Sequence, residues 1–263
     1  MQTPIVVERH DSPILLGFPH DWTYVPPEIE VDLNICGKKR EDTDWHIYKL
    51  YSGLFPEMTS VRTRIHRYVI DVNRDPRDIS LYPDQNTTSL VPLTNFDGED
   101  IWKTQPSALE IEHRVTKYYQ PYHTAVEFEI QRIKNIHGFA IFWDCHSIRS
   151  RIPFLFDGTL PDFNIGTDSG ASCASELESR VTEQCCSARD YSTVLNGRFK
   201  GGWCTRHFGR PKDGIHALQM EVAQSTYLHS ETAPWVYDKT KARKLRSHLK
   251  TLLELLADWH PIG

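Results

Sequence analysis

Short apolar runs alternate with amphipathic helical stretches along this chain. The alternation predicts an α/β fold with a mixed, mainly parallel sheet flanked by helices. The 263 residues are 39% hydrophobic and 25% charged, an ordinary globular composition and a common length for one α/β domain. We find no internal repeat and no linker of biased composition. The sequence therefore predicts a single domain over residues 1–263 with a sizeable core.

The first part of the chain provides a strand and a helix. The apolar run 13–19 has proline at both ends and is predicted to form the first strand. Aromatic and aliphatic residues then recur at helical spacing over 43–55, with Asp42 or Thr43 as the N-cap. Residues 60–72 are predicted to hold one or two strands.

Residues 75–103 are rich in proline, glycine and polar residues and show no sustained period. We predict a long loop there, and loops of this length in compact domains usually cover a functional site. A capping box at 107–110 predicts a helix that runs toward His137 and stops at Gly138, with a kink at Pro121.

The second half is predicted to continue the alternation of strands and helices. In order, we expect a central strand at 139–143, an irregular region at 153–172, a helix over 176–186, a hairpin with turns at Asn196-Gly197 and Gly201-Gly202, a strand at 215–222 and an amphipathic helix over 239–259.

Charge and composition exclude several classes of function. The net charge of −5 and the pI of about 6.2 offer no basic surface, so we expect no nucleic-acid or membrane partner. No apolar run approaches the roughly 20 residues of a membrane span, and the N-terminus has no secretory pattern, so a cytoplasmic protein is expected. The six cysteines form no regular framework and are predicted to be free thiols. The oligomeric state is left open.

A histidine closes an apolar run twice, at His20 and at His146. In open α/β sheets ligands gather at the carboxyl ends of the strands, so the two imidazoles are expected to converge. Asp144 lies two residues before His146 and is available to orient its ring. Either histidine alone is equally well explained as an ordinary hydrogen-bonded residue, and the pair together favours a metal site.

A catalytic metal site of this kind needs a third protein ligand, often a carboxylate, and leaves one position for water. Asp44, at the start of the first predicted helix, is the preferred candidate, and Asp21 is the alternative. An acidic residue at a helix N-terminus is also explained by the helix dipole alone. The donor set suits a divalent ion, with zinc preferred and iron or cobalt as alternatives.

Polar residues after the apolar run 68–72 suggest how an acidic substrate is held. Asn73 and Arg74 can bind a carboxylate through an amide and a bidentate guanidinium. Arg67 can face a developing oxyanion. The alternatives are a surface ion pair of Arg74 with Asp71 or Asp75 and a solvated strand residue at Arg67.

Glu221 lies in the apolar run 217–223, where a carboxylate is costly unless it is paired or used. Desolvation would raise its pKa, which suits a general base that removes a proton from water and returns it to the leaving amine. Structural pairing with an arginine is the alternative. A nucleophilic hydrolase is set aside, because there is no Gly-x-Ser-x-Gly motif and Cys145 would point away from His146 on a strand.

Motifs spread over nearly the whole chain resemble those of the N-formylglutamate amidohydrolase (N-formylglutamate deformylase) family. They are Pro19-His20, 43–46, 67–74, 80–83, 94–98, 119–123, 144–150, 170–173, 196–202 with 205–207, and 219–221 with 224–227.

This resemblance implies a fold like that of the zinc carboxypeptidases, of the phosphorylase-hydrolase type. It also implies metal-assisted hydrolysis of N-formylglutamate to formate and L-glutamate, as in bacterial histidine degradation. His20, His146 and an acid would hold the metal, Asn73 and Arg74 would grip the substrate and Glu221 would move the proton. The carboxypeptidase pattern has a glutamate where this chain has Thr23, so the carboxylate is assigned to Asp44.

Two alternatives remain open: a deacylase or carboxypeptidase for another N-acyl acidic amino acid, and a catalytically inactive binder of acidic metabolites. The sequence assigns no role to a further group of basic residues, which are Arg149, Arg198, Lys200, Arg206 and His207.

Overall fold

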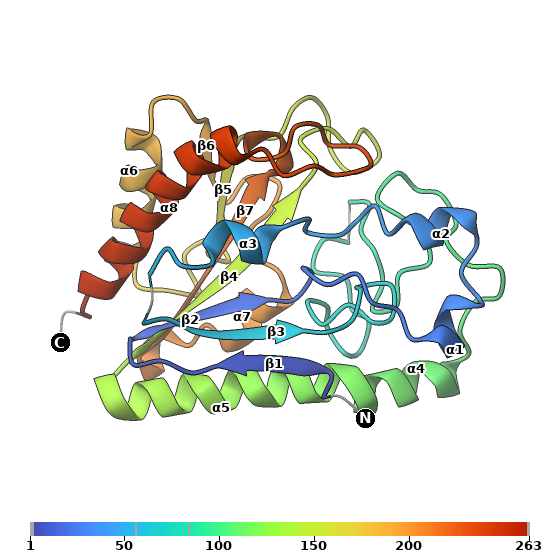
Figure 1. Cartoon of the computed structure of the whole chain (residues 1–263). Coiled ribbons are helices and arrows are strands. Elements are labelled where there is room, and N and C mark those ends of the chain that lie inside the picture. The colour runs from blue at the N-terminus through green and yellow to red at the C-terminus, as the bar shows by residue number, and fades with distance from the viewer. Residues whose placement is uncertain (1–2, 56, 84, 262–263) are drawn as a thin grey trace.

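The computed structural model describes residues 3–55, 57–83 and 85–261. Its centre is a seven-stranded mixed sheet with the strand order β1-β3-β2-β4-β7-β5-β6 (Figure 1). The strands are β1 (Ile5–Glu8), β2 (Ile14–Phe18), β3 (Thr59–Thr63), β4 (Ala140–Ile148), β5 (Phe163–Gly166), β6 (Thr193–Leu195) and β7 (Ile215–Ala223).

The middle of the sheet is parallel, as predicted. β2 pairs in parallel with both β3 and β4, and β4 pairs in parallel with β7. The antiparallel pairs are β1 with β3 and β5 with β7, while β6 is parallel to β5 at the far edge. The predicted α/β class with a mixed, mainly parallel sheet is therefore confirmed.

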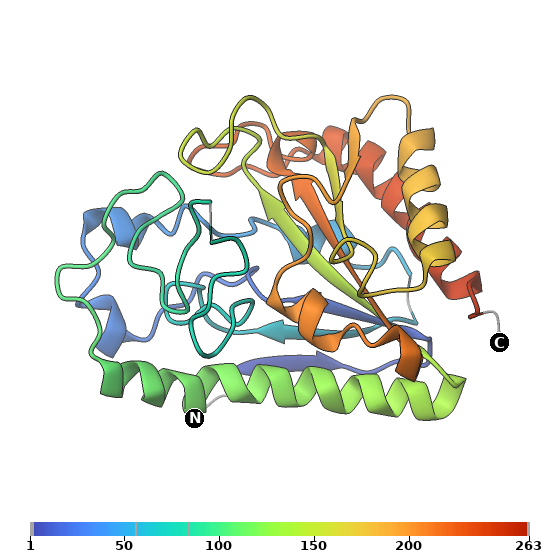
Figure 2. The same cartoon turned by 180° about the vertical axis from the view of Figure 1, so that it is seen from behind.

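Helices cover both faces of the sheet. The α-helices of the described residues are α1 (Pro27–Glu30), α2 (Ile35–Lys39), α3 (Ile47–Tyr51), α4 (Ala108–Arg114), α5 (Gln120–His137), α6 (Ser175–Ser187), α7 (Trp203–Phe208) and α8 (Lys239–Asp258), and α1 and α2 lie beyond the ends of the strands (Figure 1). α5 and α7 pack on one face, and α3, α6 and α8 on the other (Figures 1 and 2).

Burial on both faces explains the apolar runs of the central strands. All nine residues of β4 and all nine of β7 are buried, as expected for strands covered by helices on both sides. α5 contributes one stripe to the core, since Tyr122, Val126, Ile130 and Ile133 recur at helical spacing and are fully buried. This packing fixes the ends of β4 and β7, from which the site is built.

Most of the predicted elements are present. The strand at 13–19, the helix over 176–186, the strand at 215–222 and the helix over 239–259 correspond to β2, α6, β7 and α8. The central strand predicted at 139–143 continues to Ile148 as β4. The predicted helix to His137 is α4 and α5, which end at Gly138 in the left-handed region (φ 83°).

A π-helical turn, Val115–Tyr119, joins α4 to α5. It lies directly before Pro121, which has no N–H to continue the ladder and for which the sequence predicts a kink. Residues 75–103 form no helix or strand where the structure describes them, as the sequence predicts.

The helix predicted over 43–55 is wrong in extent, because only Ile47–Tyr51 is helical. The backbone N–H of Asp44 donates to the carbonyl of His20 (3.1 Å), and His46 has a left-handed backbone (φ 62°). These interactions hold residues 43–46 as a turn beside the end of β2. Asp44 therefore lies before the helix and not within its first turn.

The predicted hairpin at 196–202 is also wrong. β6 pairs with β5 in parallel, and residues 196–202 form a loop that leads into α7. Gly202 is needed there for close packing, because a Cβ atom at this position would lie 2.4 Å from the side-chain nitrogen Nδ2 of Asn73. The region 153–172 was predicted to be irregular but contains β5, and β1 was not predicted.

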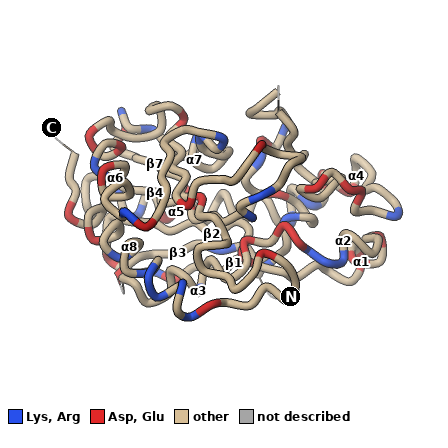
Figure 3. Tube along the Cα trace, turned by 90° about the horizontal axis from the view of Figure 1, so that it is seen from above, with Lys and Arg blue, Asp and Glu red and all other residues tan. Residues whose placement is uncertain are grey.

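The sequence predicts no membrane span, free cysteines and no basic surface. Within the described residues, no helix is both long enough and apolar enough to cross a membrane. All six cysteines are free, as predicted. Acidic and basic residues are interspersed along the trace, including along α6 and α8 (Figure 3).

Candidate active site

The predicted site residues converge where the central strands end. His20 follows β2 by two residues, His146 lies near the end of β4, and Glu221 lies near the end of β7. His146 and Glu221 are direct neighbours in the register of β4 and β7. Because β2, β4 and β7 are parallel, their carboxyl ends meet at one edge of the sheet, as an open α/β sheet requires of its ligand site.

His20, Asp44 and His146 form a group suited to a metal ion. One ligand atom from each lies within 4.8 Å of the others, and all three side chains are buried. Asp44 Oδ2 is 3.2 Å from His146 Nδ1 and 3.9 Å from His20 Nδ1. The centroids of the two imidazole rings are 5.0 Å apart. The convergence that the sequence predicted for the two histidines is present.

A buried carboxylate lies beside the opposite nitrogen of each ring, and for His20 it forms a hydrogen bond. His20 Nε2 is 2.7 Å from Asp71 Oδ1, and His146 Nε2 is 3.1 Å from Asp144 Oδ1. Such partners fix the ring orientation of a metal-binding histidine and leave the other nitrogen free to coordinate. Asp144 occupies the position that the sequence proposed for it.

Electrostatics around the two imidazoles differ. Burial and the charge of Arg67 lower the pKa of His20, so its ring is neutral and able to bind a metal. Burial opposes protonation of His146, but Asp144 and Asp44 outweigh burial and raise its pKa well above 6.5. A proton and a cation therefore compete for the His146 nitrogen that faces Asp44.

Asp21, the alternative carboxylate, lies elsewhere. It pairs with Arg62, whose Nε and Nη2 lie 3.0 and 2.6 Å from Asp21 Oδ2. It does not line the cavity described below and is absent from the histidine group. Of the two candidates, the fold brings Asp44 to the histidines.

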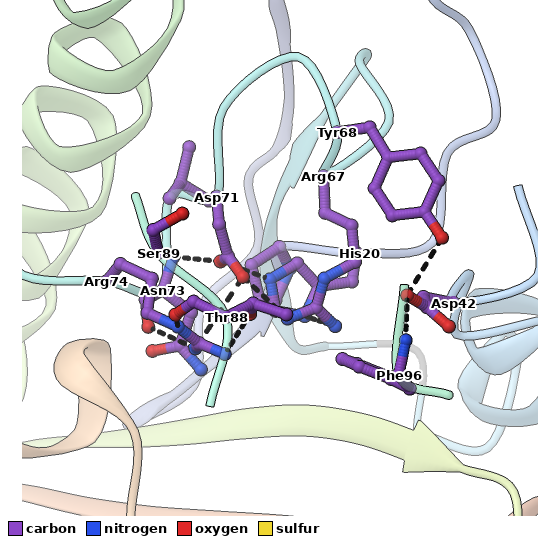
Figure 4. Close-up of polar contacts among 12 residues, drawn as sticks. His20, Asp42, Arg67, Tyr68, Asp71, Asn73, Arg74, Thr88, Ser89 and Phe96 are labelled. Atoms are coloured by element: carbon purple, nitrogen blue, oxygen red, sulfur yellow. Dashed lines mark hydrogen bonds and ion pairs between the residues drawn. The ribbon is translucent and has the colours of Figure 1, made fainter. Parts of the chain in front are cut away.

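Arg67 and Arg74 share one buried carboxylate, that of Asp71 (Figure 4). Arg67 Nη2 is 2.5 Å and Arg74 Nη1 is 3.6 Å from Asp71 Oδ2. Burial acts to raise the pKa of Asp71, but the two guanidinium groups hold it well below its usual range. Arg67 Nη1 also lies 3.4 Å from His20 Nδ1, and the Arg67 guanidinium lies over the ring of Phe96. Asp71 thus contacts both arginines and His20, one of the three candidate metal ligands.

Asn73 and Arg74 are held in place by the loops around them. Asn73 Nδ2 is 3.1 Å from His146 Nε2, and Asn73 Oδ1 accepts from the backbone N–H of Cys204 (2.8 Å). Arg74 donates through Nε to the carbonyl of Thr88 and through Nη2 to its hydroxyl. Thr88 belongs to the long 75–103 loop, so that loop positions Arg74.

Glu221 is buried, and its closest polar neighbour is Gln219, whose Nε2 donates to it at 3.1 Å. Burial raises the pKa of Glu221 to about 8, although the nearby His146 acts in the opposite direction. The described residues place no arginine or lysine within ion-pair distance, so structural pairing, the alternative suggested by the sequence, is absent. A carboxyl group with this pKa can exchange a proton near neutral pH.

These side chains open into one cavity of about 260 Å³. It is lined by all seven residues that the sequence proposed for the site, namely His20, Asp44, Arg67, Asn73, Arg74, His146 and Glu221. The 75–103 loop forms much of the wall through Asp78–Tyr82 and Asn86–Ser89, which fits the predicted covering role. Cys145 does not reach the cavity and packs into the hydrophobic core instead.

Two residues near the site were given no such role by the sequence. Asp71 was considered only as an ion-pair partner of Arg74, although it lies in an apolar run, the same signal that singled out Glu221. Arg198 was left without a role, and of the five unassigned basic residues it is the one that lines the cavity.

Comparison with known proteins agrees with this geometry. The model of the N-formylglutamate amidohydrolase family matches residues 12–228. An N-formylglutamate deformylase of Pseudomonas aeruginosa is 42% identical over 98% of both chains. The chain belongs to the N-formylglutamate amidohydrolase family. A second family member, the N-formylglutamate deformylase of Pseudomonas putida, is 43% identical over 94% of this chain and 93% of its own.

Solved structures with this fold include another amidohydrolase. The crystal structure of N-formylglutamate amidohydrolase from Ralstonia eutropha JMP134 matches with a TM-score of 0.82 and 22% identity over 98% of each chain. A protein from Agrobacterium tumefaciens matches with a TM-score of 0.71 and 17% identity over 97% of this chain and 94% of its own. At these identities the likeness establishes the fold alone.

Proposed function

We propose that this chain hydrolyses N-formyl-L-glutamate to formate and L-glutamate with a divalent metal ion, zinc in the first place and iron or cobalt as alternatives. The observation that carries the proposal is the 42% identity to an N-formylglutamate deformylase over nearly the full length of both chains. The geometry supports it, because a metal-type group, a buried carboxylic acid and three arginines line one cavity.

The donor set fits a metal ion of this kind. His20, His146 and Asp44 would hold it, and two imidazoles with one carboxylate are a common ligand set of catalytic zinc sites. Asp71 and Asp144 hold the imidazoles by their opposite nitrogens, as metal ligands require. When bound, such an ion polarises a carbonyl group and lowers the pKa of water.

Glu221 would act as the general base and acid. It takes a proton from the attacking water and delivers it to the leaving nitrogen of glutamate, so that formate and the amine separate. Its burial in β7, next to His146 in β4, gives it a pKa of about 8, at which both protonation states are accessible near neutral pH.

Arg67 would stabilise the negative charge that develops on the formyl oxygen. Its guanidinium is buried, is fixed by Asp71 and lies beside His20, so it needs no rearrangement during the reaction. Arg74 and Asn73 would bind a carboxylate of the substrate. Arg74 is oriented by Thr88, and Asn73 lies between His146 and Cys204.

The test is a formate-release assay together with the metal content of the purified protein. We expect N-formylglutamate to be hydrolysed faster than N-acetylglutamate and N-formylaspartate, about one equivalent of metal, and loss of turnover with a chelator. Preference for N-acetylglutamate would favour a deacylase of another N-acyl acidic amino acid. No turnover of any of the three, with binding retained, would favour an inactive binder of acidic metabolites.

A further inference from the structure

Arg198 occupies the cavity wall and has no role in the reaction described above. It lies in the loop between β6 and α7, and its guanidinium is fixed by two backbone carbonyls from other loops. Nε donates to Leu155 (3.0 Å), and Nη2 donates to Asn86 (2.9 Å). Its planar group lies 5.2 Å from the ring centroid of Phe199 and 5.5 Å from that of Tyr82. Arg198 is thus held rigidly but without a charged partner.

Arg198 has no ion-pair partner among the described residues, although the more distant Glu221 acts to raise its pKa. No carboxylate of the described residues lies within 4 Å of its guanidinium, whereas Arg67 and Arg74 face Asp71, and Arg206 faces Asp168 (3.0 Å). Burial and the like charge of Arg74 lower the pKa of Arg198. Its Nη1 makes no hydrogen bond to the described residues, so part of the guanidinium fork is free to bind an anion.

The charges on the cavity wall match a substrate with two carboxylates. Arg67 and Arg74 share the single carboxylate of Asp71, so these three side chains together carry one net positive charge. That charge can balance the carboxylate next to the formamide. A second carboxylate needs another cation, and Arg198 is the remaining lysine or arginine among the described cavity residues.

The position of Arg198 suits the side chain of glutamate. Tyr82 accepts from the backbone N–H of Lys200 (3.0 Å) and donates to the carbonyl of Gly201 (3.1 Å), which joins the 75–103 loop to the loop that carries Arg198. Leu155 and Phe199 line the same wall and provide an apolar surface for methylene groups. The same cavity thus holds a further guanidinium group next to apolar side chains.

We propose that Arg198 binds the side-chain carboxylate of the substrate and thereby makes the cavity selective for N-acyl dicarboxylic amino acids over neutral ones. This inference rests on the proposed function. Arg74 and Arg198 would each bind one carboxylate, as planar guanidinium forks do when they are already held in place.

The test compares charged and neutral side chains of the same length. We expect Arg198→Met to lower kcat/KM for N-formyl-L-glutamate by about 10²-fold, mainly through KM, because a desolvated charge pair is lost. N-formyl-L-glutamine, which has an amide in place of the carboxylate, should change by less than about threefold. Arg198→Lys keeps the charge without the fork and should retain an intermediate preference.

The matched control is Arg206→Met. Arg206 also lies over the Tyr82 ring (5.2 Å), but it pairs with Asp168 and does not line the cavity. We expect this variant to keep the wild-type preference for N-formylglutamate over N-formylglutamine. Equal losses on both substrates in Arg198→Met, or an unchanged preference, would overturn the proposal.

A binding measurement separates this inference from the proposed function. Calorimetry compares glutarate, a five-carbon dicarboxylate, with its monoamide and requires no turnover. Wild-type protein should prefer glutarate. Arg198→Met should reduce that preference strongly, and Arg198→Lys should reduce it less. One outcome is that wild-type protein releases no formate but prefers glutarate, and that Arg198→Met abolishes this preference. The proposed reaction would then be wrong and the anion site at Arg198 would be supported. The other outcome is that wild-type protein hydrolyses N-formylglutamate and that Arg198→Met still prefers glutarate. The proposed reaction would then be supported and the anion site at Arg198 would be wrong.

Discussion

At the scale of single residues, one pattern recurs around the site: a buried carboxylate lies beside a histidine or an arginine and fixes its position. Asp71 pairs with His20 and with both Arg67 and Arg74, and Asp144 lies beside His146 and accepts from the hydroxyl of Thr205 (3.0 Å). Glu221 differs because no lysine or arginine of the described residues lies within ion-pair distance of it and burial raises its pKa to about 8. This difference separates the carboxylates that position other groups from the one proposed to move a proton.

The proton-transfer role of Glu221 predicts a specific loss. Glu221→Gln keeps the size of the side chain and removes its basicity, so kcat should fall by about 10²–10⁴-fold. Binding of L-glutamate, measured by calorimetry, should be retained. Glu127→Gln, at a partly exposed glutamate on α5, is the control and should keep full activity. Turnover that survives in Glu221→Gln would show that the base is another group.

Asp71 should affect metal binding without being a ligand. Asp71→Asn weakens the hydrogen bond that orients His20, so metal affinity should fall by about 10–100-fold in a competition titration with a chromophoric chelator. Asp21→Asn is the matched comparison, since the Asp21 side chain is also hidden from solvent but pairs with Arg62. A larger loss of affinity in Asp21→Asn than in Asp71→Asn would contradict the assignment of Asp44 as the carboxylate ligand.

At the scale of elements, the site depends on how closely β2, β4 and β7 pack beneath it. Gly17 in β2 pairs with Asp144 in β4, and a Cβ atom at this position would lie 2.6 Å from Cζ of the buried Phe142. β2 approaches the core so closely that only glycine fits. The positions of His20 and His146 relative to each other therefore rest on this contact between strands.

Gly17→Ala should destabilise the fold by about 1–3 kcal/mol, because extra volume in a filled core forces neighbours to shift. Urea unfolding measures the change. The double variant Gly17→Ala/Phe142→Leu removes the clashing ring atoms, so it should lose less stability than the sum of the two single variants. Additive losses would show that the ring does not limit the approach of β2.

Sequence patterns located the elements well where packing follows a simple period. α6, β7 and α8 were predicted to within about one residue, because one face or both faces of each contact the core. The prediction failed at 43–55 and 196–202. In both segments, backbone hydrogen bonds or close contacts to distant residues, His20 in one case and Asn73 in the other, override the local pattern.

At the scale of the whole molecule, acid should destabilise the protein through buried neutral histidines. Burial lowers the pKa of His123 and of His216 to about 4. The unfolded chain binds these protons near pH 6.5, so each histidine's contribution to stability is present above about pH 6.5 and is lost as the pH falls toward 4. The loss should be on the order of 1–3 kcal/mol for each histidine, with the smaller value for His216.

Urea unfolding at pH 7.0, 5.5 and 4.5, with a chelator present so that metal release does not contribute, checks this dependence. His123→Gln should show a shallower fall in the free energy of unfolding than the wild type. His10→Gln, at an exposed histidine, should leave the fall unchanged. A wild-type free energy of unfolding that did not change between pH 7.0 and 4.5 would contradict the prediction.

The prediction of one domain over residues 1–263 has its own test. The strands of a single sheet come from both ends of the chain, since β1 and β7 belong to it, so the chain should unfold in one cooperative transition. In scanning calorimetry the calorimetric and van't Hoff enthalpies should then be equal. Two resolved transitions would indicate two independent folding units.

The sequence by itself indicated the fold class, the main strands and helices, and seven of the residues that line the cavity, with Asp21 left as an alternative to Asp44. It did so because strand ends and buried polar residues leave local signals, such as a histidine after an apolar run or a glutamate within one. These signals depend only on neighbouring residues, so they can be read without knowing the fold.

Only the tertiary structure decided which partners meet. It separated Asp44 from Asp21, joined Asp71 to His20 and two arginines, and left Arg198 at the cavity without an ion-pair partner among the described residues. Each of these outcomes depends on loops that approach one another across the sheet. Contacts between residues far apart in sequence leave no local period, so only the folded chain reveals them.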